Sequence, residues 1–137
     1  MRLLLDTQVF LWFIEADPRL STHAANVIGD PDNGRYLSVA SVWEIAIKVK
    51  IGKLRLNAPG PLDTVLTQQL TINDVTLLPV EYRHAVRVHA MPYARHANGG
   101  DHTDPFDRLI VSQSLVEDLT LVSTDAVLDG YGIVRCW

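Results

Sequence analysis

Short runs of apolar residues alternate along this chain with longer stretches in which apolar residues recur every three or four positions. The short runs predict buried β-strands, and the periodic stretches predict amphipathic α-helices. The predicted strands cover residues 2–5, 36–38, 76–78, 119–122 and 133–136. The predicted helices cover residues 8–15, 21–28 with Ser21 as the N-cap, 40–51, 62–70, 81–90 and 105–117, and a helical turn covers residues 125–128.

This order of elements predicts an α/β fold. Strands that are apolar throughout, each followed by a helix, are typical of a mostly parallel sheet with helices on both faces. One long irregular stretch, residues 91–103, is rich in His, Asn and Gly. Irregular segments of that length in a compact domain are more often functional than accidental.

The composition is that of a folded, water-soluble domain. The 137 residues are 47% apolar and 20% charged, which excludes a disordered tail and leaves room for one core. We therefore expect a single domain over residues 1–137. The one cysteine, Cys136, excludes an internal disulfide framework and fits a reducing, cytoplasmic compartment. The apolar run at residues 9–14 is too short to span a membrane, so we expect no membrane partner.

Two acidic residues follow predicted strands directly. Asp6 comes after Leu3-Leu4-Leu5, and Asp125 comes shortly after the strand at residues 119–122. Ligands of open α/β sheets bind beyond the carboxyl ends of the strands. Two carboxylates placed there would repel each other unless a positive charge lies between them.

Two further acidic residues lie within predicted helices that are otherwise largely apolar and are therefore expected to be buried. Glu44 lies in an apolar helix, and Asp107 lies in the first turn of the helix that begins at Pro105. Buried carboxylates are costly unless they are paired or bound to a metal. Their oxygens are the ligands that Mg²⁺ and Mn²⁺ prefer, so the four acids together predict a metal site for phosphate chemistry.

Each acid also has a simpler explanation. Asp6 could cap the following helix, and Asp125 could be an ordinary turn residue. Glu44 and Lys48 are spaced for a helix-surface ion pair. Asp104, with Pro105 after it, is a good N-cap, and Asp107 would then interact favourably with the helix dipole. The joint placement of the four acids favours one site over four separate explanations.

Other chemistries find less support. The five histidines show no zinc-ligand spacing with the single cysteine. His102, two residues before Asp104, could approach the acids, but a solvated position in the loop is the favoured interpretation. The chain has no Gly-x-Ser-x-Gly elbow, Walker A motif or Gly-x-Gly-x-x-Gly motif, so acyl transfer, P-loop NTP hydrolysis and dinucleotide binding are not indicated.

The formal charge of −4 argues mildly against a protein that binds nucleic acid by bulk positive charge. Without the four acids above, however, acidic and basic residues are equal in number. Four cations crowd into one segment and are candidate contacts for a polyanion such as RNA: Lys48, Lys50, Lys53 and Arg55. Ordinary solubilising surface residues are the alternative for each of them.

Four segments together resemble a known family. They are residues 3–7 (LLLDT), 41–48 (SVWEIAIK), 102–110 (HTDPFDRLI) and 119–125 (LTLVSTD). In this order they are similar to PIN-domain proteins, in particular to VapC-type toxins of bacterial toxin–antitoxin modules. The match extends from residue 1 to about residue 135, and its specificity comes from the four segments together rather than from any one.

The resemblance implies a three-layer α/β/α sandwich with Mg²⁺- or Mn²⁺-dependent endoribonuclease activity, using one or two ions. It also implies a homodimer and a cognate VapB-type antitoxin. The catalytic, metal-binding acids would be Asp6, Glu44, Asp107 and Asp125, with Thr7, Ser41, Asp104 and Thr124 around them. The alternatives are a PIN-type nuclease acting in RNA processing or on DNA outside a toxin–antitoxin pair, and a non-catalytic protein-binding module.

Overall fold

The computed structural model describes residues 1–137 and contains one five-stranded sheet. The strands are β1 (Arg2–Leu5), β2 (Gly34–Ser38), β3 (Val75–Leu78), β4 (Thr120–Val122) and β5 (Arg135–Cys136). The helices are α1 (Thr7–Ile14), α2 (Thr22–Gly29), α3 (Val39–Lys50), α4 (Leu62–Ile72), α5 (Tyr82–Ala90) and α6 (Pro105–Glu117), followed by the 3₁₀ helix η1 (Ala126–Tyr131). No helix has the length and apolar character needed to cross a bilayer.

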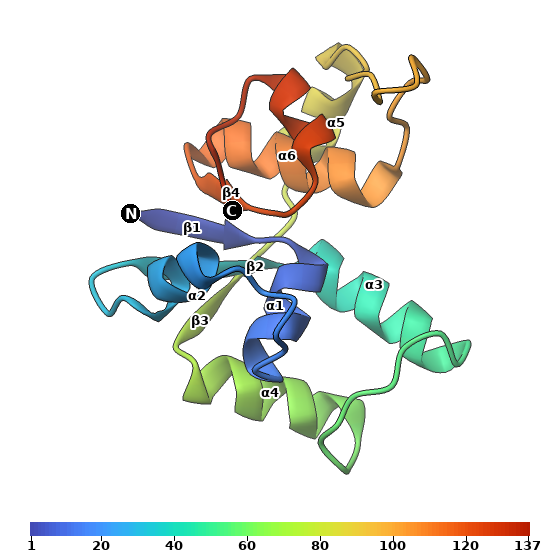
Figure 1. Ribbon diagram of the computed structural model, residues 1–137. Helices are drawn as coiled ribbons and strands as arrows, with labels where there is room; N and C mark the ends of the chain where they lie inside the picture. Colours follow the sequence, from blue (N-terminus) through green and yellow to red (C-terminus); the bar gives the residue numbers. More distant parts are fainter.

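The sheet has the order β3-β2-β1-β4-β5, and every neighbouring pair is parallel. The predicted α/β class with a mostly parallel sheet is therefore confirmed. Helices α5 and α6 lie on one side of the sheet, and α1, α2 and α4 lie on the other (Figure 1). Because β1 is central and parallel to β4, the residues that follow these two strands emerge at the same edge.

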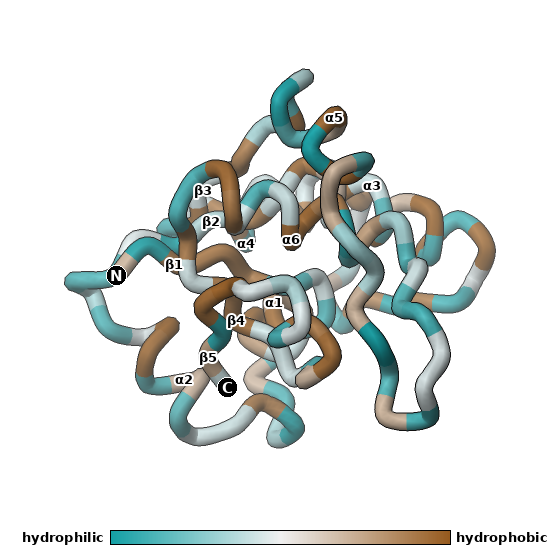
Figure 2. Tube along the Cα trace, turned by 90° about the horizontal axis from the view of Figure 1, so that it is seen from above, coloured by the Kyte–Doolittle hydropathy of each residue, from teal (hydrophilic) through white to brown (hydrophobic).

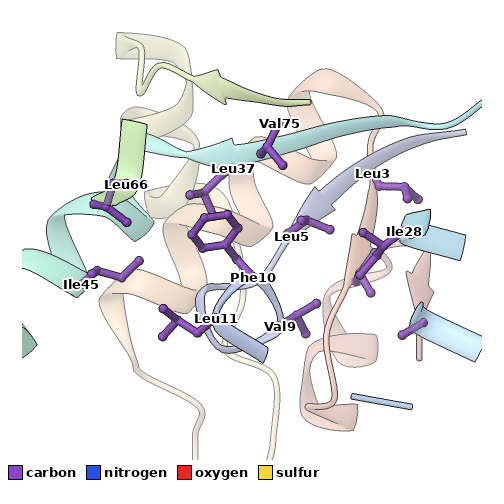
Figure 3. Packing of buried hydrophobic residues seen from close by; sticks show 12 residues of the cluster. Leu3, Leu5, Val9, Phe10, Leu11, Ile28, Leu37, Ile45, Leu66 and Val75 are labelled. Atoms are coloured by element: carbon purple, nitrogen blue, oxygen red, sulfur yellow. The ribbon is translucent and has the colours of Figure 1, made fainter. Parts of the chain in front are cut away.

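The alternation of side chains along β1 divides the core between the two faces. Leu3 and Leu5 belong to a buried cluster with Phe10 of α1 at its centre (Figure 3). Leu4 points the opposite way, into a second cluster with residues of α6. All three leucines are fully buried, which explains why β1 is apolar at successive positions rather than at alternate ones. The tube around β1 and β4 is correspondingly brown in the hydropathy view (Figure 2).

The predicted elements differ from the observed ones mainly at their ends. Ser21 caps α2 as predicted, with its Oγ accepting from the backbone N–H of Ala24 at 3.0 Å. Helix α3 begins at Val39 because Ser38, the last residue of β2, also serves as its N-cap. The last strand is only Arg135–Cys136, shorter than the predicted 133–136.

The irregular segment 91–103 is tied to the helices by one buried arginine. Arg108 of α6 is only 6% exposed, and its Nη2 donates to the carbonyls of Val88 and Met91 at 3.0 and 2.9 Å. Its Nη1 donates to the hydroxyl of Tyr131 at 3.1 Å. Arg108 therefore fixes the end of α5, the start of the segment and η1 relative to α6.

We expect Arg108→Met to destabilise the fold. The substitution keeps much of the side-chain volume but leaves the carbonyls of Val88 and Met91 without this donor. An unsatisfied buried polar group costs about 1–3 kcal/mol, so the midpoint of urea unfolding should fall clearly. Arg87→Met, at an exposed position of α5, is the matched control and should change the midpoint little. Equal midpoints for the two variants would contradict the role given to Arg108.

Candidate active site

A cavity of about 450 Å³ opens at the carboxyl edge of the sheet. The segment after β1 and the helices α1, α3 and α6 contribute to it. Its lining is mostly polar or charged and includes Asp6, Thr7, Gln8, Glu44, Lys48, Lys53, Asp104 and Asp107. We call this the acidic cavity. Three of the four predicted metal-binding acids therefore line one cavity, although they come from segments far apart in the chain.

Asp6 follows β1 and is held by the neighbouring strand. Its backbone N–H donates to the carbonyl of Val122 at 3.1 Å, and Ser123 Oγ donates to its Oδ2 at 2.7 Å. Burial raises the pKa of Asp6 above its usual value, and the charges of Glu44 and Asp125 raise it further. The Ser123 hydroxyl opposes this shift but does not cancel it.

Glu44 lies on α3 with 17% of its side chain exposed. Its Oε2 is 3.2 Å from Lys48 Nζ, so the ion pair considered from the sequence is present. Both residues also line the acidic cavity. The ion pair and a role as a metal ligand are thus compatible explanations for Glu44. Lysine side chains are flexible, so a cation could take the place of the Lys48 ammonium beside Glu44.

Asp104 and Asp107 begin α6 in different roles. Asp104 is the N-cap, as predicted, because its Oδ1 accepts from the backbone N–H groups of Phe106 and Asp107 at 2.9 and 3.1 Å. Asp107 lies in the first turn of α6 and accepts no such bond. The pKa of Asp107 is raised from 3.8 to about 6, mainly by burial. The charges of Asp104 and Asp6 also raise it, and the hydrogen bond with His102 opposes the shift.

Asp125 lies beside the other acids rather than in the lining of the acidic cavity. Its Oδ1 caps η1 by accepting from the backbone N–H of Val127 at 3.1 Å. One of its oxygens lies within 4.8 Å of ligand atoms of both His102 and Asp107. Its charge also contributes to the raised pKa of Asp6. Asp125 therefore both caps η1 and lies next to the other acids.

The interpretation of His102 as a solvated loop residue is wrong. The residue is 3% exposed, and its Nε2 lies 3.1 Å from Asp107 Oδ2. Its Nδ1 lies 2.8 Å from the hydroxyl oxygen of Tyr131, and this hydroxyl donates its one hydrogen to the His102 carbonyl at 3.1 Å. The partner that buries His102 comes from η1, 29 residues later, and local sequence does not reveal it.

The hydroxyls near the acids are arranged differently from the sequence-based expectation. Thr7 Oγ1 donates to Ser41 Oγ at 2.9 Å, and both residues are buried, so this pair joins α1 to α3. Thr124 is exposed. The hydroxyl that contacts an acid is that of Ser123, which sequence reasoning missed. The signal available in the sequence was its position directly after the predicted strand at residues 119–122, just as Asp6 directly follows the strand at residues 2–5.

Two of the four candidate cations line the acidic cavity, and the other two do not. Lys48 and Lys53 line the acidic cavity. Lys50 lies on an exposed part of α3 outside this lining, and Arg55 lines a different hollow of about 390 Å³ between α3 and α4. Only Lys48 and Lys53 are therefore placed where a phosphate entering the acidic cavity would meet them.

The residues present fit a hard divalent cation. The acidic cavity offers carboxylate oxygens and has neither cysteine nor histidine in its lining, which favours Mg²⁺ or Mn²⁺ over zinc. Neighbouring carboxylates raise the pKa of Asp6 and that of Asp107, so a positive charge placed beside these two acids would relieve the repulsion. The basic residues in the lining are Lys48 and Lys53.

Comparison with protein families gives one extended match. The family model described as "PIN domain" matches residues 3–133. This range contains all four acids, His102 and Ser123. A comparison with curated proteins finds no match.

Several solved structures have a similar fold. VapBC2 from Rickettsia felis, bound to a DNA fragment from its promoter, is 13% identical with a TM-score of 0.68, over 99% of this chain and 98% of that one. DNA-bound VapBC from Salmonella typhimurium is 15% identical with a TM-score of 0.65, over 98% and 96%. VapBC-1 from nontypeable Haemophilus influenzae is 14% identical with a TM-score of 0.63, over 99% and 97%. At these identities the likeness shows the fold alone.

We expect Asp107→Asn to stabilise the metal-free protein at neutral pH. Because the folded-state pKa of Asp107 is raised, the folded chain binds its proton more tightly than the unfolded chain does. The free energy of unfolding of the wild type should therefore fall as pH rises from about 4 to about 6, and this loss is complete above the folded pKa. Asparagine carries no charge and removes this contribution.

The measurement is thermal unfolding in the presence of a chelator between pH 4 and pH 8. At pH 7.5 the variant should melt a few degrees above the wild type, which corresponds to on the order of 1 kcal/mol after allowance for solvent screening. Asp32→Asn, in an exposed turn, is the matched control and should follow the wild type. A variant that melts lower than the wild type at pH 7.5 would contradict the electrostatic account.

Proposed function

Because the chain belongs to the PIN-domain family, a family of nucleases, we propose that it is a Mg²⁺- or Mn²⁺-dependent endoribonuclease. We propose further that it is the toxin of a VapBC-type toxin–antitoxin pair, acting in the cytoplasm as a homodimer. The observation that carries the proposal is the gathering of three carboxylates around one cavity, from the residue after β1, from α3 and from α6, with Asp125 beside them.

Asp6, Glu44, Asp107 and Asp125 would hold the ion or ions. A divalent cation there would lower the pKa of a coordinated water and stabilise the negative charge that develops on the phosphodiester. The protein's own contribution is to hold the ligands in place. Ser123 orients Asp6, and His102 orients Asp107. Such supporting hydrogen bonds fix the orientation of carboxylate ligands.

Glu44 is the best-placed acceptor for the proton of the attacking water. Three of the acids have an oxygen engaged by a fixed partner: Asp6 by Ser123, Asp107 by His102 and Asp125 by the backbone of Val127. The polar partner of Glu44 is the flexible Lys48 ammonium. A general base needs an oxygen free to meet the water; Glu44 differs from the other three acids because the side chain of Lys48 could move away and leave both of its oxygens free.

The solved structures of similar fold support the proposal that this chain pairs with an antitoxin. Three of them are VapBC assemblies, and two of these are bound to DNA. We infer a VapB-type antitoxin as the partner of this chain and RNA as its substrate. Lys48 and Lys53 would meet the RNA backbone at the acidic cavity, since cations in this place attract phosphates toward the acids.

Asp6→Asn tests the proposed activity. The substitution preserves shape but removes the charge that the cation needs, so Mg²⁺-dependent cleavage of total RNA should fall more than about 100-fold, measured by mapping new RNA ends. The rise in melting temperature caused by Mn²⁺ should also be lost. Asp32→Asn is the matched control. In bacteria, expression of the wild type should arrest growth and expression of Asp6→Asn should not.

Each readout separates one part of the proposal. Wild-type rates of cleavage by Asp6→Asn would overturn the site. A wild type that shows no Mn²⁺-dependent stabilisation and cuts no RNA would favour the non-catalytic binding module. Cleavage of RNA without growth arrest would favour a PIN-type nuclease outside a toxin–antitoxin pair.

Lys53→Ala and Lys50→Ala form a matched pair for the RNA contact. Lys53 lines the acidic cavity, and Lys50 lies outside its lining on the same exposed segment. Lys53→Ala should weaken RNA binding. It should also make the slope of the logarithm of the binding constant against the logarithm of the salt concentration less steep by about one unit, because one phosphate contact is lost. Lys50→Ala should leave both unchanged. Equal effects of the two substitutions would show that bulk charge, rather than the cavity, attracts the RNA.

A further inference from the structure

One exposed tryptophan, Trp43, directly precedes Glu44 but is not part of the lining of the acidic cavity. Trp43 of α3 is 62% exposed, whereas the other two tryptophans, Trp12 and Trp137, are half-buried against each other with ring centroids 5.9 Å apart. Exposed tryptophan is unusual because its large apolar ring is costly to leave in water. Trp43 packs on Phe106 of α6, with centroids 5.3 Å apart and planes inclined by 56°.

Both rings are fixed beside the acidic cavity by the chain itself. Trp43 directly precedes Glu44 on α3, and Phe106 directly precedes Asp107 on α6. Neighbouring residues on a helix point about 100° apart. The same two helices that turn Glu44 and Asp107 toward the acidic cavity therefore present the two rings on the adjoining surface, where they meet.

A continuous path joins the rings to the acids. An aromatic hollow of about 200 Å³ is lined by Trp43, Pro105, Phe106 and Leu109. A middle hollow of about 280 Å³ shares Phe106 with it. The middle hollow also shares four charged residues with the acidic cavity: Glu44, Lys48, Lys53 and Asp104. A strand whose phosphate lies in the acidic cavity would thus pass two lysines before it reached the rings.

We propose that Trp43 and Phe106 form a stacking platform for a nucleobase of single-stranded RNA, next to the phosphate that is cleaved. The inference rests on the proposed nuclease function and names the form of its substrate. Aromatic side chains stack on any base, and bases in a duplex are unavailable because they already stack on their neighbours. The platform therefore selects unpaired RNA without selecting a base sequence.

The placement favours a nucleotide over a protein partner. The aromatic hollow, of about 200 Å³, has the volume for about one flat ring. The lysines between the rings and the acids suit a phosphate that follows the base. Ile47 and Ile51 extend the apolar stripe of α3 beyond Trp43, so a second copy of the chain is the competing occupant that the experiment must separate.

The experiment measures RNA binding in the Asp6→Asn background with Mg²⁺ present, so that the probe is not cut. The probe is fluorescein-labelled oligoadenylate, single-stranded or annealed to oligouridylate, followed by fluorescence anisotropy. Trp43→Ala removes the ring, Trp43→Leu keeps apolar surface without an aromatic face, and Trp43→Phe restores one. Tyr82→Ala is the matched control, because Tyr82 is an 83% exposed aromatic residue on α5. Sedimentation analysis of each variant reports the oligomeric state.

Trp43→Ala and Trp43→Leu should each weaken binding of the single strand about tenfold or more, while Trp43→Phe retains most of the affinity and Tyr82→Ala all of it. The protein that keeps Trp43 should bind the single-stranded probe more tightly than the duplex probe. Unchanged binding by Trp43→Ala, or full affinity in Trp43→Leu, would overturn the platform. A changed oligomeric state with unchanged RNA binding would assign the surface to a second copy.

Failure of the proposed function would look different. In that case the chain with its native Asp6 would cut no RNA with Mg²⁺, whatever residue stands at position 43, and the platform would fall with it. If the native chain cuts RNA and the Trp43 variants bind as before, only the platform is wrong.

Discussion

The repulsion among carboxylates held at one edge of a parallel sheet is the constraint around which this molecule is organised. Asp6 and Asp107 both have raised pKa values, because burial disfavours their charged form and neighbouring acids add to the effect. A fold does not keep such an arrangement for stability, since neutral side chains would be better tolerated there. A cation placed among these carboxylates would relieve the repulsion.

The contacts around the acids can be understood as the means of holding them against this repulsion. Each of three acids has a fixed partner in its own segment or in a neighbouring one: Ser123 for Asp6, His102 for Asp107 and the backbone of η1 for Asp125. The partners are in turn supported, as His102 is by Tyr131 and Tyr131 by Arg108. Among the four acids, Glu44 is the one paired with a lysine side chain, which is 44% exposed.

The same helices organise the surface around the site. Because α3 and α6 each carry an acid next to an aromatic residue, placing Glu44 and Asp107 together also places Trp43 against Phe106. The acidic cavity, the two lysines and the ring pair, in which Trp43 is exposed and Phe106 half-buried, thus form one surface that passes from charged to apolar. This order matches the alternation of phosphate and base along a nucleic-acid strand.

The sequence by itself determined the features that depend on neighbours in the chain. The parallel α/β fold, the cap at Asp104, the ion pair of Glu44 with Lys48 and the position of Asp6 after β1 all follow from local spacing. Only the tertiary structure decided that His102 is buried against Tyr131 and that Ser123 reaches Asp6, 117 residues away. Such pairs depend on which strands become neighbours in the sheet, and local hydrophobic patterns indicate that a strand is buried but not which strand lies beside it.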